Sequence, residues 1–301
     1  MGAVTSAALY LPILIGEGMF FLPRGLPLLT IAVSGVTQFF GLQFMFETVR
    51  RSEVSKAMPV IVSLQPVFSL LLSLALPLLL PFSPEPLTGR RLAGIGLVIA
   101  GSYLLSQAGG KRSRFDAGTW LYILLAGFFL ALSGVCADAA YTAFESAYLS
   151  PGAGAGAKNL MFAKAFLWGR WFALAGGAVY VAATRNFRAL HRGRAEGAQA
   201  QGRLAAGGTG ASRRGWVVLV FLFGQGCGAL AVVLQQYAIK LGNVVTVSAL
   251  NGVQFFFMIA LSALLSRFVP RLLLEASSRR TLLQKIVWSA VLFGGIVLLV
   301  V

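Results

Sequence analysis

Apolar residues along this chain gather in long blocks, which short polar or basic connections separate. A helix rises about 1.5 Å per residue, so about 20 apolar residues cross the hydrocarbon core of a bilayer. A membrane β-barrel would instead need short segments of alternating polarity. The pattern therefore predicts an all-α polytopic membrane protein with about nine transmembrane helices, at about 3–22, 26–47, 55–80, 90–107, 118–141, 158–183, 215–239, 244–269 and 282–301.

Composition and charge strengthen this prediction and set its topology. Hydrophobic residues make up 57% of the chain and charged residues only 11%, against about 25% charged in soluble domains. The net charge of +16 would suit nucleic acid, but 18 of the 25 Lys and Arg lie in four alternate connections. Basic residues near spans stay on the cytoplasmic side, so we expect a lipid bilayer and no nucleic acid as partner. The cytoplasmic connections would be those that follow 26–47, 90–107, 158–183 and 244–269.

Two internal segments look like copies of each other. The segment "RRLAGIGLVIAGSYLL" (90–105) aligns with "QKIVWSAVLFGGIVLL" (284–299): each carries a small residue followed by Gly, and each ends in Leu-Leu. The helices before them also correspond, which predicts a four-helix unit at 1–107 and a five-helix unit at 118–301. A repeat with an odd number of helices reverses its orientation in the membrane, so we expect inverted repeats. Transporters have this architecture, with the binding site between the repeats near the bilayer midplane.

The two units resemble EamA domains of the drug/metabolite transporter superfamily. The resemblance rests on "TVRRSEVSKAMPVIVSLQPVFSLLLSLALP" with "LTGRRLAGIGLVIAGSYLLS", and on "QQYAIKLGNVVTVSALNGVQFFFMIALSALLS" with "LLQKIVWSAVLFGGIVLLV". It implies ten helices in two inverted five-helix repeats around a central cavity, and export or exchange of small metabolites, amino acids or drugs. Block 3–22 matches the second helix of that plan, so the first helix is expected to be missing. The resemblance also implies two cytoplasmic termini, whereas the charge count places the termini on opposite sides.

Amides within the blocks are the first candidates for substrate contact. An amide that faces lipid is costly, so these side chains are expected to point inward. Asn251 and Gln254 lie one helical turn apart and are the strongest pair. Hydrogen bonding that merely joins helices is the competing interpretation. The full set of candidates is Gln38, Gln65, Gln225, Gln236, Asn251 and Gln254.

Charged residues within the blocks are rarer, and three of them are candidates for ion coupling or charge pairing: Glu17, Asp138 and Arg170. An acid at depth can carry protons, pair with a base or bind a cationic substrate. Asp138 could pair with a base on the block 158–183, where Arg170 lies. Glu17 could instead sit near an interface and extend toward water.

Prolines interrupt the block 55–80, which contains Pro59 and Pro66. Pro59 falls near the start of the span, where the first N–H groups have no intrahelical partner. Pro66 is deeper and is expected to kink the helix. A kinked helix with Gln65 beside the kink suits a cavity wall, and packing geometry without substrate contact is an equally open interpretation.

Other features argue against enzyme chemistry. The only histidine, His191, lies in the segment 184–214, which is rich in Gly, Ala, Arg and Gln and reads as a flexible basic linker. Cys136 and Cys227 match no metal spacing, so neither a metal nor another cofactor is expected. Membrane-embedded enzymes need clustered catalytic residues, which the blocks lack.

The sequence therefore predicts a transporter of a small solute in the plasma (inner) membrane, and not an enzyme. A non-transporting scaffold or a membrane-embedded enzyme is the alternative. A homodimer is left open by the sequence.

Overall fold

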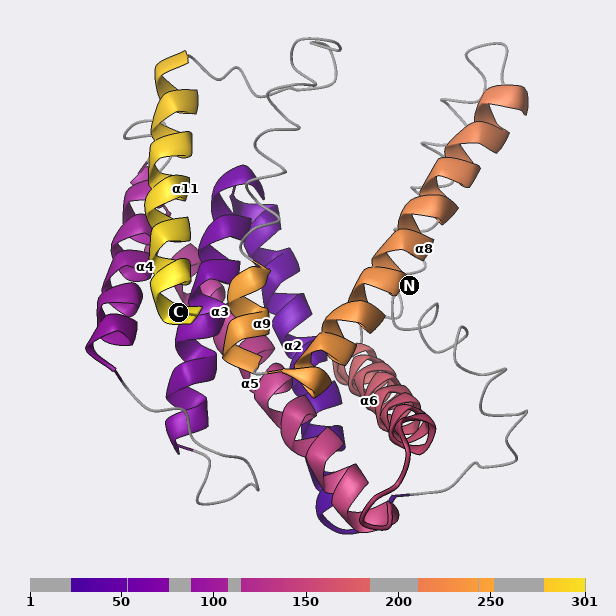
Figure 1. Cartoon of the computed structure of the whole chain (residues 1–301). Helices are drawn as coiled ribbons and strands as arrows, with labels where there is room; N and C mark the ends of the chain where they lie inside the picture. Colours follow the sequence, from indigo (N-terminus) through magenta and orange to yellow (C-terminus); the bar gives the residue numbers. More distant parts are fainter. Residues whose placement is uncertain are drawn as a thin grey trace.

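The structure is a computed structural model, and it describes residues 23–52, 54–75, 88–107, 115–184, 211–242, 244–251 and 279–300 (Figure 1). Within these ranges helices account for the regular secondary structure. The helices are α2 (Leu26–Arg51), α3 (Val54–Ala75), α4 (Gly89–Gln107), α5 (Ala117–Tyr148), α6 (Ala155–Ala183), α8 (Ala211–Leu241), α9 (Val244–Leu250) and α11 (Arg279–Val300).

Five stretches in the described part are long and apolar enough to cross a membrane: Leu26–Arg51, Ala57–Ala75, Ala117–Tyr148, Ala155–Ala183 and Leu222–Leu241. A shorter apolar stretch lies in α11. The protein is therefore a multi-pass membrane protein, as its hydropathy predicts, and the described part of it is all-α. Block 3–22 and most of block 244–269 lie outside the described residues, so the prediction of nine spans stays a prediction.

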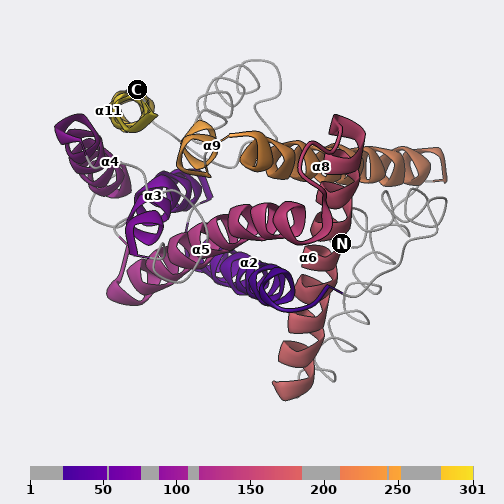
Figure 2. The same cartoon turned by 60° about the horizontal axis from the view of Figure 1, so that its bottom comes forward.

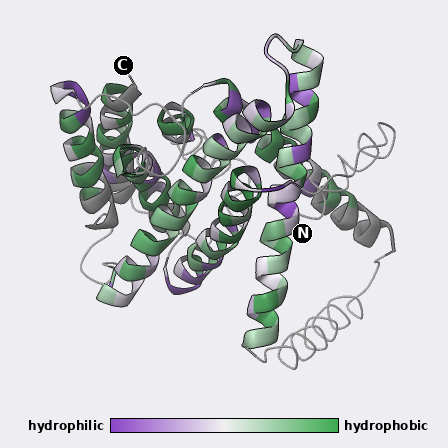
Figure 3. Ribbon diagram, turned by 90° about the horizontal axis from the view of Figure 1, so that it is seen from below, coloured by the Kyte–Doolittle hydropathy of each residue, from purple (hydrophilic) through white to green (hydrophobic). Residues whose placement is uncertain are grey.

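The outer surface of the helices is apolar in a way that suits lipid. Figure 3 shows hydrophobic residues spread around the described helices rather than confined to one face. Large apolar side chains such as Phe46, Val179 and Phe223 are 60%, 68% and 70% exposed. In water such a surface would drive aggregation, whereas the hydrocarbon of a bilayer accepts it.

Helix α5 lies at the centre of the bundle, with α2 beside it over most of its length and α3 on another side (Figure 2). Small residues allow α2 to approach its neighbours closely. A Cβ atom on Gly41 would lie 2.7 Å from Leu130 Cγ of α5, and one on Gly35 would overlap the backbone of Gly169 in α6. Such glycine contacts drive the packing of membrane helices, because lipid supplies no hydrophobic force between them.

A reciprocal pair of hydrogen bonds also joins α2 to α5. The Ser34 hydroxyl donates to the Ser133 carbonyl oxygen at 2.9 Å, and the Ser133 hydroxyl donates to the Ser34 carbonyl oxygen at 2.9 Å. Both side chains are buried. Ser34 is thus a helix–helix contact, which places its neighbour one turn on, Gln38, on the same partly buried side of α2.

Helix α3 packs on a neighbouring side of α5 through Val60, Ile61 and Leu64, which cluster with Ile123 and Ala126. It is assigned as one helix across both prolines. Since Pro66 has no N–H, the carbonyl oxygen of Val62 lacks its usual helical partner.

Helices α4 and α11 form a separate pair at one edge of the bundle (Figure 2). A Cβ atom on Gly101 would lie 2.9 Å from Leu292 Cγ, and one on Gly295 would lie 2.9 Å from the backbone N of Val98. Gly101, the later of the two residues in α4, thus meets Leu292, the earlier in α11. Val98, the earlier in α4, meets Gly295, the later in α11. The two helices are therefore antiparallel.

Contacts at the helix ends show which connections share a side. The Tyr148 hydroxyl at the end of α5 accepts from the Arg24 N–H, which precedes α2, at 2.9 Å. Lys240 Nζ at the end of α8 donates to the Lys158 carbonyl oxygen at the start of α6, at 2.8 Å. The connections before α2, between α5 and α6, and after α8 consequently lie together, in agreement with the alternation expected from the sequence.

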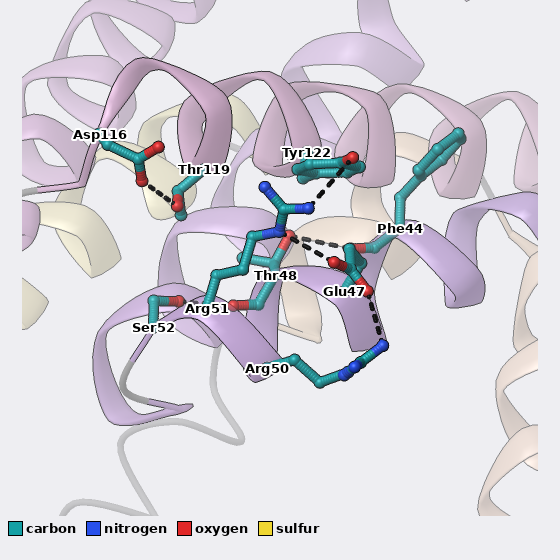
Figure 4. Close-up of polar contacts among 9 residues, drawn as sticks. All are labelled: Phe44, Glu47, Thr48, Arg50, Arg51, Ser52, Asp116, Thr119 and Tyr122. Atoms are coloured by element: carbon teal, nitrogen blue, oxygen red, sulfur yellow. Dashed lines mark hydrogen bonds and ion pairs between the residues drawn. The ribbon is translucent and has the colours of Figure 1, made fainter.

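The opposite end of the bundle carries a basic cluster where α2 ends and α5 begins (Figure 4). Glu47 accepts from Arg50 at 3.1 Å and from Arg51 at 2.9 Å. The Arg51 guanidinium also lies over the Tyr122 ring of α5, 4.4 Å from its centroid. Basic residues at a span end fit the headgroup region of a membrane.

Candidate functional site

The strongest concentration of polar and aromatic contacts between described spans lies where α5, α6 and α8 meet. We call it the α5–α6–α8 cluster and define it as Tyr141, Glu145, Asn159, Phe162, Phe166, Arg170, Gln236, Tyr237 and Lys240. It contains two of the residues that the sequence singles out, Gln236 and Arg170.

Gln236 is held by a tyrosine of α5. The Tyr141 hydroxyl donates to Gln236 Oε1 at 2.9 Å, and both residues are buried. A buried amide without a partner would cost free energy, so this bond explains how α8 tolerates Gln236 against α5. The amide of Gln236 therefore points inward, and its observed partner is another helix.

The Lys240 ammonium lies at the end of the cluster that is near the start of α6. Lys240 Nζ is 3.2 Å from Glu145 Oε1 of α5, and the Lys240 side chain is only 8% exposed. Its ammonium also lies 5.7 Å from the Phe162 ring centroid and 5.9 Å from that of Tyr237. Lys240 thus joins the ends of three helices through one charge.

Aromatic rings fill the space beneath Lys240. The Phe162 ring centroid lies 5.1 Å from that of Tyr141 and 5.3 Å from that of Tyr237. The Tyr237 hydroxyl donates to Asn159 Oδ1 at 3.2 Å. Phe162 therefore contacts α5 and α8 at once, and the ring contacts fix how the three helices cross.

Arg170 lies deeper along the same helix. Phe162, Phe166 and Arg170 are spaced four residues apart, so they follow one another along one side of α6. The Arg170 guanidinium carbon is 4.8 Å from the Phe166 ring centroid, and the residue is only 7% exposed. Its Nε has no hydrogen-bond partner. No ion pair among the described residues includes Arg170.

The structure does not bring the other predicted residues into this cluster. Gln38 and Gln65 are partly buried on separate helices, α2 and α3, and Asn251 is partly buried in the turn just after α9. Gln225 is partly buried, but its neighbours on α8 are exposed because this half of α8 leans away from α5 and α6 (Figure 1). Glu17 and Gln254 lie outside the described residues.

Asp138 lies half-buried on α5, one turn before Tyr141. The sequence allows it to pair with a base on α6, but no ion pair among the described residues joins it to Arg170. Its role in coupling stays a prediction.

Sequence reasoning missed Tyr141, Asn159, Phe162 and Tyr237, and it assigned Lys240 to a connection. The four-residue spacing from Phe162 to Arg170 was a visible signal, because it predicts one helix face. The partners on α5 and α8 had no such signal, since the contacts span about 80 to 95 residues along the chain.

Within the described residues, no group of three or more His, Cys, Asp or Glu could hold a metal ion. Cys136 is buried and Cys227 is exposed, and both are free thiols.

No protein-family model matches the chain, and a comparison with curated proteins finds no match either. The functional argument consequently rests on the geometry described above.

Proposed function

We propose that this protein is a transmembrane transporter that carries a small solute by alternating access between two inverted repeats. The observation that carries the proposal is the packing of α4 against α11. Gly101 meets Leu292, and Gly295 meets Val98. The alignment of 90–105 with 284–299 pairs positions that are 194 apart, so Gly101 corresponds to Gly295 and Val98 to Leu292. The two contacts are therefore made by equivalent residues with the roles of the helices exchanged.

Such an exchange has a simple geometric meaning. If a helix and its copy pack through equivalent residues in antiparallel fashion, a local twofold axis runs between them, perpendicular to the helices. Two chance neighbours would have no reason to use equivalent positions. An axis of this kind lying in the membrane plane relates inverted repeats in many secondary transporters.

The polar groups inside the bundle support the same function. Transporter sites lie near the bilayer midplane, and intramembrane charges mark pathways for ions or substrates. Arg170 lies near the middle of α6, and Gln236 and Tyr141 form a polar contact between α5 and α8. The prolines within α3 add a helix that can bend where its backbone bonding is interrupted.

Metabolite profiling of cells with and without the gene tests the proposal. We expect at least one small solute to change in concentration across the plasma (inner) membrane when the full chain is produced. The matched control is the same chain with Gly101→Leu, which should disrupt the α4–α11 contact through overpacking. Identical solute profiles for cells that carry the intact chain in the membrane and cells that lack it would count against transport.

A further inference from the structure

Arg170 combines features that a structural arginine in a membrane rarely combines. It lies 15 residues after the first residue of α6, or about 22 Å along the helix. Only 7% of it is exposed, so it cannot extend its charge to water at an interface as a residue near a helix end would.

Nothing among the described residues neutralises this charge. The guanidinium lies over the Phe166 ring, which carries no charge. Asp138 of α5, the acid that the sequence suggests as a partner, forms no ion pair with it among the described residues, and the other buried charge of α6, Lys164, is also basic. A buried charge without a counter-ion is strongly unfavourable, and its usual function in a membrane protein is to meet a ligand or an ion.

We propose that Arg170 binds the anionic group of the transported solute, so that the substrate class is an organic carboxylate or phosphate. The inference rests on the proposed transport function. The unpartnered Nε and the planar guanidinium suit oxyanions, because a guanidinium can donate parallel hydrogen bonds to two oxygens of a carboxylate or phosphate. Phe166, whose ring lies beside the guanidinium, is buried in this structure and would be the apolar neighbour of a bound solute.

Two cations and two aromatic rings follow one another along this side of α6. Lys240 lies at the end of the cluster and Arg170 near mid-span, with Phe162 and Phe166 between them. Lys240 holds Glu145 at 3.2 Å in this structure, so an arriving anion would compete with that carboxylate. A lipid headgroup fits less well, because headgroups lie at the bilayer surface and Arg170 lies about 20 Å from either end of its helix.

Thermal unfolding of the full chain, purified in a detergent without anionic lipid, tests the inference. The probes are benzoate and phenyl phosphate, with benzamide as the uncharged match for benzoate and chloride at equal ionic strength. We expect at least one anion to raise the unfolding temperature in a concentration-dependent way, and benzamide to have no effect. Benzoate alone would identify a carboxylate site, and phenyl phosphate alone a phosphate site.

The variant Arg170→Met separates binding from structure. Without probe it should unfold at the same or a higher temperature, since it removes an uncompensated buried charge. Its apparent affinity for the anion should fall by about thirtyfold or more. Arg50→Met, which removes one positive charge at the opposite end of the bundle, should keep the full anion effect.

Three results would overturn the inference. The first is no anion effect on the unmodified chain, and the second is an equal anion effect on Arg170→Met. The third is that, without probe, Arg170→Met unfolds at a much lower temperature and Arg170→Lys restores the original unfolding temperature. The last result would make Arg170 structural.

Different results would refute the transport proposal and the anion site. An anion effect that depends on Arg170 in a chain that moves no solute would refute transport alone, and flux of a neutral solute that Arg170→Met leaves unchanged would refute the anion site alone.

Discussion

At the residue scale, the clearest device is the pair Ser34 and Ser133, whose hydroxyls each bond the other's backbone carbonyl. Ser34→Ala and Ser133→Ala should each lower the free energy of unfolding by about 0.5–1.5 kcal/mol, because hydrogen bonds between membrane helices are modest in strength. The two losses should be nearly additive, because each hydroxyl donates to a backbone carbonyl that the other substitution leaves in place. Unfolding of the detergent-solubilised chain would measure them. Ser146→Ala, whose hydroxyl bonds its own helix, is the control, and losses no larger than in that control would contradict the bonds between α2 and α5.

A second residue-scale prediction concerns pH. Asp116 precedes α5, outside the span, and the Thr119 hydroxyl donates to its carboxylate. That hydrogen bond holds the pKa of Asp116 below its ordinary value. A carboxyl group whose pKa is lower in the folded state stabilises the fold above its unfolded pKa, and this stabilisation is lost as the pH falls through the folded pKa.

We therefore expect the unfolding temperature of the unmodified chain to exceed that of Asp116→Asn by a constant amount above about pH 5 and to approach it below about pH 4. Asparagine is also a good residue before a helix, so the variant should fold. A difference between the two chains that does not change between pH 7 and pH 3 would rule out this contribution of Asp116.

At the scale of single elements, glycines decide how closely helices approach. Gly35→Ala would place a Cβ against the backbone of Gly169, so α6 must move away from α2. We expect a loss of about 1–3 kcal/mol in stability. Gly96→Ala in α4 is the matched control, since nothing lies within 4 Å of its added Cβ and alanine favours helix. Equal stability of the two variants would show that α2 and α6 are not in close contact.

The helices themselves could largely be predicted from the sequence, because hydrophobic length alone defines them. The end of α5 could not: the helix continues from 141 to Tyr148, over residues that include Ala143, Glu145 and Ala147 and neither Gly nor Pro. Nor could the partner of Gln236 be predicted, because a polar residue in a span indicates that it needs a hydrogen-bond partner but not which residue provides it. Arg170 was recognisable as unusual from its type and position, whereas the absence of an ion pair to it from the described part of α5 depends on how α5 and α6 cross.

At the scale of the whole molecule, the proposed twofold relation of α4 and α11 makes a prediction about cross-linking. Cysteine pairs at 98 with 295 and at 101 with 292 should both form disulfides readily, since each pair lies at a close contact between antiparallel helices. Positions 92 and 286 correspond to each other in the repeat alignment and would be neighbours only if the two helices were parallel. A cysteine pair at these positions should therefore not cross-link. Efficient cross-linking of that third pair would contradict the antiparallel packing and the inverted repeat with it.

The central claim is that the molecule moves a small anion across a membrane, and solute uptake into vesicles that contain the purified full chain tests it most directly. We predict saturable uptake of the solute identified by profiling, above that of lipid-only vesicles, with loss of uptake in Arg170→Met and retention in Arg50→Met. Uptake that never exceeds lipid-only vesicles, although the chain is inserted and binds the same solute, would contradict the account.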